Sequence, residues 1–132
     1  MGRRVAREVV FKYLFEKDMN KELGFDRDFY SKREDVLELE EAQVGYVLDT
    51  VENVLINIDK IDKYIEDSIE VWNFERVGSV ERALLRYAVY EIKFSDIGIE
   101  IIINEAVELA KRYGEEKSSE FINGVLAKIA KK

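Results

Sequence analysis

Apolar residues recur at three- and four-residue steps along almost the whole chain, the spacing of one face of an α-helix. An early apolar stripe predicts an amphipathic helix over residues 3–20, and a shorter helix is expected over 28–37, after a polar turn around Gly24. The longest stripe predicts one continuous helix over residues 41–68, roughly 40 Å long. Its members are Val44, Val47, Leu48, Val51, Val54, Leu55, Ile58, Ile61 and Ile65.

The pattern breaks after Trp72 and then resumes, which suggests a division of the chain near that residue. Helices are expected over 79–94 and 100–113, and a last one from residue 118 onward. Since about three helices lie on each side of the break, the pattern predicts an all-α protein.

Small residues mark the expected helix ends. Ser79 and Ser118 are suited to the N-cap positions of the helices that follow them. Gly114 is placed to adopt the left-handed conformation just after a helix end. Gly124 lies within the last helical stripe and is expected to permit close approach of another helix.

Composition narrows the class of protein. The chain has 132 residues, enough for one domain, and its 47% hydrophobic and 37% charged residues indicate a globular fold. It contains no cysteine and no histidine, so disulfides, cysteine zinc sites and the commonest general base are excluded. We find neither an apolar run of membrane-spanning length nor the apolar core of a signal peptide, and therefore expect a cytoplasmic protein without a membrane partner.

Charge is distributed unevenly along the chain. The net charge is -7, yet residues 1–12 carry +3, residues 13–70 carry -10 and residues 71–132 are neutral. Arg3, Arg4 and Arg7 supply most of the positive charge at a helix start, where the macrodipole disfavours cations. These arginines either belong to a solvated terminus or form a phosphate-binding arm, since the planar guanidinium suits bidentate phosphate contacts.

Three sequence blocks, in order, resemble the NusB family of transcription antitermination factors. They are the arginine-rich start RRVARE (residues 3–8), the central VERALLR (80–86), and INEAVELAKRYG (103–114) followed by FINGVL (121–126). Residues 17–70 match only in helical character. The resemblance implies an all-α, NusB-like single domain over residues 1–132, made of two packed subdomains of about three helices each. They would comprise residues 1–71 and 72–132.

The resemblance also implies a function. A NusB-like protein would bind the boxA element of ribosomal RNA transcripts together with NusE, a small-subunit ribosomal protein. The pair would join the elongating RNA polymerase complex with other Nus factors and promote read-through of terminators. Sequence specificity would come mainly from splayed, single-stranded bases.

The resemblance also implies roles for individual residues in and near the matched blocks. The RNA-binding set would be Arg3, Arg4, Arg7, Arg86, Lys111, Lys117, Ser118 and Phe121, and the NusE-facing set would be Phe15 and Glu81. Two positions depart from the family pattern: Val5 stands where an additional arginine is common, and Lys117 where the family is often acidic. Phe121 has two interpretations, a core residue or an exposed ring that stacks on a base.

Other functions find less support in the residues. Glu105 with Glu108, and Asp59 with Asp62, have the i, i+3 spacing of paired acids, but without histidine they are expected to be solvated. We expect no enzyme activity, no cofactor and no metal site. The alternatives are a NusB-like RNA-binding module related to RNA cytosine methyltransferases, and a helical self-associating interaction protein. A homodimer could use the long apolar stripe as its seam.

Overall fold

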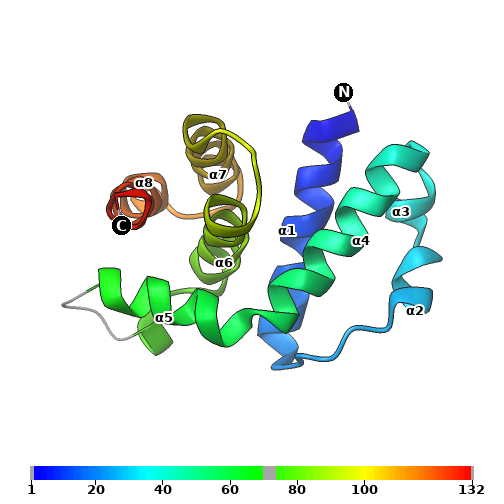
Figure 1. Ribbon diagram of the computed structural model, residues 1–132, viewed down its shortest axis with the longest axis horizontal. Coiled ribbons are helices and arrows are strands. Elements are labelled where there is room, and N and C mark those ends of the chain that lie inside the picture. Colours follow the sequence, from blue (N-terminus) through cyan, green and yellow to red (C-terminus); the bar gives the residue numbers. More distant parts are fainter. Residues whose placement is uncertain (1, 70–73, 132) are drawn as a thin grey trace. The chain divides into compact units, whose positions relative to one another are not determined.

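The computed structural model describes residues 2–69 and 74–131 (Figure 1). Over these residues the chain forms eight α-helices and one 3-10 helix, with no β-strand. The helices are α1 (Gly2–Asn20), α2 (Arg27–Ser31), α3 (Glu34–Leu37), α4 (Glu41–Ile56), α5 (Ile58–Ser68), the 3-10 helix η1 (Phe74–Arg76), α6 (Ser79–Phe94), α7 (Ile99–Tyr113) and α8 (Ser118–Ala130). The predicted all-α class is confirmed.

The helices form two compact units. The first unit is Met1–Asn57, with α1 to α4, and the second is Ile58–Lys132, with α5 to α8. Trp72, near which the sequence suggested a division, lies outside the described residues.

In the first unit, α1 packs along α4, and the short helices α2 and α3 also contact α4 (Figure 1). Val10 and Tyr13 of α1 and Val47 and Val51 of α4 are completely buried. Burial of each valine contributes roughly 1.5–3 kcal/mol to folding. Two short helices replace the single helix expected over 28–37, because the backbone becomes extended at Arg33, the N-cap of α3.

The expected continuous helix over 41–68 is wrong, because it is interrupted at Asn57. Asn57 caps α4, and both its backbone N–H and its side-chain Nδ2 donate to the carbonyl of Asn53, at 3.1 and 2.8 Å. Short amide side chains compete with the backbone for such acceptors and disfavour a helix interior. The apolar steps continue across the interruption, so periodicity alone could not reveal it.

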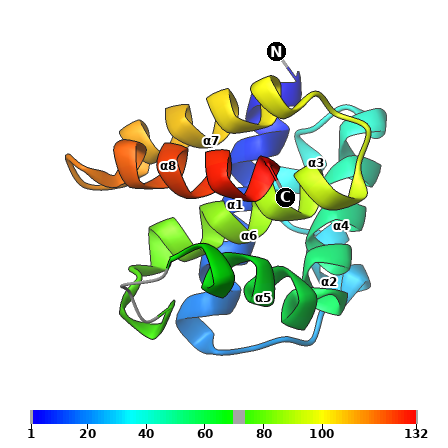
Figure 2. The same cartoon turned by 60° about the vertical axis from the view of Figure 1, so that its left-hand side comes forward.

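In the second unit, α6 contacts α5, α7 and α8, and α7 lies against α8 (Figure 2). The fully buried side chains of this unit come from all four helices. They include Ile61 and Ile65 of α5, Leu84 and Leu85 of α6, Ile102 and Ala110 of α7, and Ile122, Leu126 and Ile129 of α8. The apolar stripes predicted for the second half of the chain therefore form one core.

Two expectations about small residues of this unit are corrected. The N-cap of α6 is Gly78, in an extended conformation, and Ser79 is the first helical residue. Glycine is itself acceptable at an N-cap. A Cβ built on Gly124 would meet nothing within 4 Å, so this residue does not permit a close helix approach. In the described ranges, no helix is both long and apolar enough to cross a membrane.

Candidate functional site

The arginine-rich start occupies the first turns of α1. Arg3 and Arg4 are exposed, whereas Arg7 is only 3% exposed and donates from Nη1 to the hydroxyl of Tyr46 on α4, at 3.0 Å. The described first turn of α1 contains no acidic residue. Two exposed guanidinium groups therefore stand at the positive end of a helix dipole, an arrangement that favours an anion.

Four more of the expected RNA-binding residues gather at the turn between α7 and α8. Lys111 is exposed in the last turn of α7, and Lys117 is exposed at the N-cap position of α8. Phe121, in the first turn of α8, is partly exposed, and Ser118 is buried. Exposed cations can hold phosphates, and a partly exposed ring can stack on a base.

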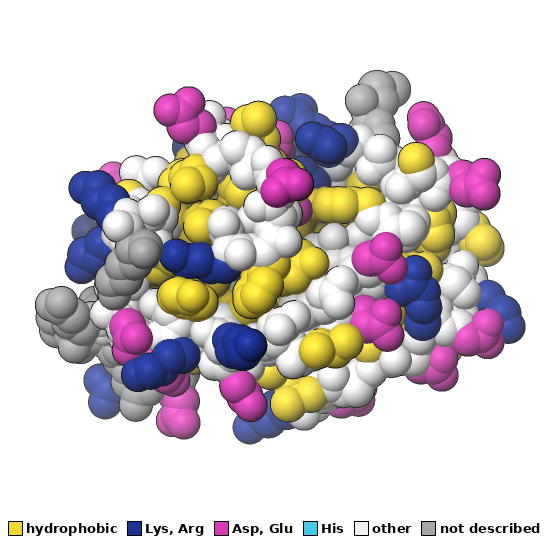
Figure 3. Space-filling model, viewed as in Figure 1, with side chains coloured by type: hydrophobic (Ala, Val, Ile, Leu, Met, Phe, Trp, Pro, Cys, Tyr) yellow, Lys and Arg dark blue, Asp and Glu magenta, His cyan; other side chains and the backbone are white. Residues whose placement is uncertain are grey.

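The basic side chains do not form a broad field on the face that Figure 3 shows. There, lysine and arginine side chains are interspersed with aspartate and glutamate. Binding of a polyanion to this face would therefore depend on particular residues and their geometry rather than on a continuous positive surface.

Ser118 joins the α7–α8 turn to the start of α6. Its Oγ accepts a hydrogen bond from the backbone N–H of Glu115, at 2.9 Å, and donates one to the carboxylate of Glu81. Lys117 occupies the N-cap position expected for Ser118, whose side chain is directed to α6 instead. The structure thus connects two residues that the sequence assigned to different surfaces.

Gly114 is needed for this arrangement, but not for the reason that the sequence suggested. Its backbone is extended, with φ -95° and ψ -170°, so the expected left-handed conformation is wrong. A Cβ on Gly114 would lie 2.7 Å from both Cβ and Oγ of Ser118 and 2.8 Å from the carbonyl oxygen of Ala110. Glycine is therefore required by close packing.

Arg86 lies in an ion pair between α6 and α5. Its Nε and Nη2 donate to the two carboxylate oxygens of Asp62, both at 2.9 Å, and its guanidinium lies 5.4 Å from the ring centre of Phe74. The side chains of Arg86 and Asp62 are 15% and 22% exposed. The expectation that Asp62 is a solvated acid is wrong, because the fold pairs it with Arg86.

Phe15, expected on the NusE-facing surface, is partly exposed on α1. Its ring centroid lies 6.0 Å from that of Phe11, which is buried. Glu81, the other residue of that set, is partly exposed in the first turn of α6. The fold leaves part of each side chain accessible.

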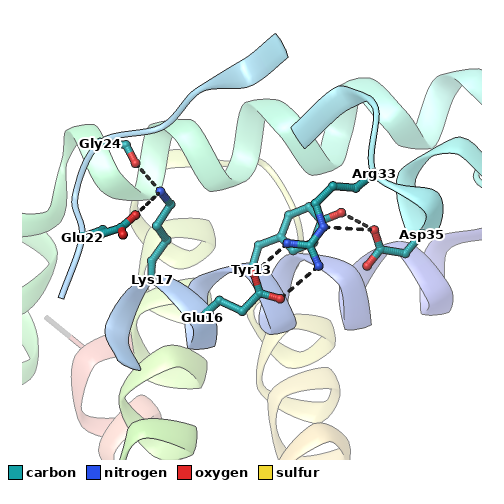
Figure 4. A network of polar contacts seen from close by, with 7 residues as sticks. All are labelled: Tyr13, Glu16, Lys17, Glu22, Gly24, Arg33 and Asp35. Atoms are coloured by element: carbon teal, nitrogen blue, oxygen red, sulfur yellow. Dashed lines mark hydrogen bonds and ion pairs between the residues drawn. The ribbon is translucent and has the colours of Figure 1, made fainter. Parts of the chain in front are cut away.

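A polar network on the same helix as Phe15 was not predicted (Figure 4). The hydroxyl of Tyr13 donates to the carboxylate of Asp35, and burial together with this hydrogen bond raises the pKa of Tyr13 far above its ordinary value. Arg33 donates to both carboxylate oxygens of Glu16, at 2.8 and 3.2 Å, and lies 4.7 Å from the ring centre of Tyr13.

The same network continues along α1 to Lys17. The Lys17 ammonium group donates to the carbonyl oxygen of Gly24 and lies 3.4 Å from the Glu22 carboxylate (Figure 4). This contact holds the loop after α1 against the helix. The only sequence signal was the i, i+3, i+4 spacing of Tyr13, Glu16 and Lys17.

No cluster of three acidic side chains suited to a metal ion occurs over residues 2–69 and 74–131. The candidate residues form contact surfaces with exposed cations, partly exposed rings and a partly exposed carboxylate.

Comparison with known proteins gives consistent matches. Residues 4–131 match the NusB family. The transcription antitermination protein NusB of Fusobacterium nucleatum subsp. nucleatum is 42% identical, and the alignment covers 98% of this chain and 89% of that protein. T. maritima NusB has a TM-score of 0.82 at 33% identity, covering 100% of this chain and 92% of that one.

A further solved structure contains antitermination factors NusB and NusE in complex with dsRNA. Its matched chain has a TM-score of 0.82 at 29% identity, and the match covers 98% of this chain and 96% of that one. The curated relatives are antitermination proteins, and such factors are not enzymes. Sequence and fold agree over nearly the full length, and the chain belongs to the NusB family of transcription antitermination proteins.

Proposed function

We propose that this chain binds the boxA element of ribosomal RNA transcripts together with NusE. The pair joins the elongating RNA polymerase with other Nus factors in the cytoplasm and promotes read-through of terminators. The observation that carries the proposal is the match, over 98% of this chain, to a fold solved in complex with NusE and RNA.

The exposed residues have complementary roles in RNA binding. Arg3 and Arg4 hold phosphates at the start of α1, and Lys111 and Lys117 hold phosphates at the α7–α8 turn. Phe121 presents a partly exposed ring on which an unpaired base can stack, a contact that contributes about 1–3 kcal/mol.

The less accessible members of the expected set support these contacts. Arg7 secures the start of α1 by its hydrogen bond to Tyr46, and Arg86 secures α6 by its ion pair with Asp62. Ser118 is buried and acts by fixing the α7–α8 turn.

NusE contacts the surfaces that expose Phe15 and Glu81. Phe15 offers an apolar ring, and Glu81 offers a carboxylate that accepts hydrogen bonds from a basic side chain. Charge-assisted bonds of this kind are the stronger class of hydrogen bond.

Fluorescence anisotropy tests the proposal directly. A labelled single-stranded boxA-like RNA, a scrambled RNA of the same length and a duplex RNA are titrated with the protein, with and without NusE. Selective binding of the boxA-like strand that tightens with NusE is expected. Equal binding of all three RNAs would contradict sequence recognition, and absence of binding would contradict RNA binding as such.

Light scattering of the free protein completes the test. The molar mass from scattering shows whether the free protein is a monomer or a homodimer. If it is a homodimer that covers Arg3 and Arg4, the RNA affinity should fall as the protein concentration rises. The RNA affinity of a monomer should not depend on protein concentration.

A further inference from the structure

The hydrogen bond between Ser118 and Glu81 connects two surfaces of the second unit. Ser118 is 5% exposed, too little for a direct contact with a large ligand. Its single hydroxyl both accepts from the Glu115 N–H and donates to the Glu81 carboxylate. One buried side chain therefore ties the α7–α8 turn to the first turn of α6.

The Ser118 end of this bond is closely packed. A Cβ on Gly114 would lie 2.7 Å from Ser118 Oγ, and a Cβ on Gly78 would lie 2.5 Å from Glu81 Oε1. Close-packed groups transmit a displacement to their neighbours instead of absorbing it. A shift of the Glu81 carboxylate therefore acts on the buried Ser118 hydroxyl, and through it on the turn that Ser118 fixes.

The turn carries residues proposed to touch RNA. Lys117 directly precedes Ser118, Phe121 follows it by one helical turn, and the backbone N–H of Ser118 donates to the carbonyl of Glu115, at 3.0 Å. Glu81, in contrast, is partly exposed at the surface proposed for NusE. The two ligands would therefore act on opposite ends of one hydrogen bond.

We infer that Ser118 is a positioning residue that couples the protein-partner surface at Glu81 to the RNA surface at Lys117 and Phe121. A basic group of the partner that binds Glu81 fixes the carboxylate, and the carboxylate fixes Ser118 and the turn before RNA arrives. By linkage, bound RNA strengthens partner binding by the same factor. This inference rests on the proposed function.

The test measures the coupling factor, defined as the RNA dissociation constant without NusE divided by that at saturating NusE. Labelled boxA-like RNA is titrated against the wild-type chain, Ser118→Ala and the control Ser119→Ala, which makes the same change at a partly exposed neighbour. The wild type should show a factor of roughly five or more. Ser118→Ala should bring the factor close to one, and Ser119→Ala should leave it unchanged.

The ratio separates loss of coupling from general damage. Saturating NusE stabilises the folded chain, so partial unfolding would raise the factor and would not bring it close to one. A Ser118→Ala factor equal to that of the wild type would overturn the inference. A wild-type factor of one, with RNA and NusE both bound, would overturn it while the proposed function stands. Absence of RNA binding by the wild type in both conditions would overturn the proposed function, and the inference with it.

A second measurement uses the unaltered chain, in case Ser118→Ala does not fold. NusE without RNA is added to ¹⁵N-labelled protein, and backbone amide resonances are followed by NMR. The amides of Glu115 and Phe121 should shift together with that of Glu81. A shift at Glu81 with none at Glu115 would overturn the inference.

Discussion

Tyr13 on α1 donates its hydroxyl to Asp35 on α3, and this contact joins the longest helix of the first unit to one of its shortest. We expect Tyr13→Phe to lower the free energy of unfolding by about 1–3 kcal/mol, because it leaves Asp35 without this donor. Urea denaturation provides the measurement. Tyr90→Phe, on the partly exposed face of α6, is the control and should change little. Equal effects of the two variants would argue against a role for the hydroxyl.

The same hydroxyl should make stability sensitive to alkaline pH. The pKa of Tyr13 is raised in the folded chain above its ordinary value of about 10, so the stabilisation is complete below pH 10 and declines above it. In that range the unfolded chain has lost the Tyr13 proton and the folded chain keeps it. Wild-type stability should fall relative to Tyr13→Phe by up to about 1.4 kcal/mol per pH unit. Parallel stability curves of the two proteins between pH 9 and 11 would disprove this.

The Arg86–Asp62 ion pair should contribute more to the free energy of unfolding than the Lys63–Asp67 ion pair on α5. Asp62→Asn weakens a bidentate, largely covered contact, and we expect a loss of about 1–3 kcal/mol in thermal or urea unfolding. The control is Lys63→Ala, which removes a pair with Asp67 whose side chains are 72% and 49% exposed. That change should have no measurable effect. The opposite ranking would show that burial does not determine the strength of these pairs.

Replacing two glycines of the second unit by alanine should change the stability of the protein in opposite directions. Gly114→Ala brings a methyl group against Ser118 and the Ala110 carbonyl and should cost about 1–3 kcal/mol. Gly124→Ala places its methyl group in open space within α8 and should stabilise by about 0.4–1 kcal/mol. Calorimetric melting of both variants measures the difference, and a stable Gly114→Ala protein would contradict the close packing described for the turn.

Salt dependence tests the arginine arm. If about four phosphates are neutralised, the logarithm of RNA affinity should fall with the logarithm of salt concentration at a slope near roughly -3. Replacing Arg3 and Arg4 by alanine should make the slope shallower by about 1.4. The charge-matched control is Lys128→Ala with Lys131→Ala, two exposed cations near the end of α8. An unchanged slope in the arginine variant would remove the arm from RNA binding.

Helical periodicity predicted most elements of the fold, since burial of an apolar stripe dominates where a helix forms. It failed at Asn57, where one amide side chain interrupts a helix without changing the apolar steps. The preference for a left-handed glycine after a helix end failed at Gly114, because the sequence does not show that Ser118 packs against this residue.

The candidate site was predictable as a list of residues but not as an arrangement. Glu81 lies in a matched block and Ser118 lies between two of them, yet only the packing of α8 with α6 brings the two residues into contact. Arg7 and Arg86 were expected to contact RNA because they lie in blocks that resemble the family, and the fold engages them with Tyr46 and Asp62. Residue type indicates what a side chain can bind, and tertiary contacts decide which partner it has.

The helical start of α1 has a consequence for the entropy of association. Arg3 and Arg4 project from turns that are already folded, and the Arg7–Tyr46 contact anchors those turns to α4. Arginine-rich segments that fold only on binding must first order their backbone, at roughly 1–2 kcal/mol per residue. Arg3 and Arg4 present their charges on a preorganised helix, so a larger share of any phosphate contact they make would remain as affinity.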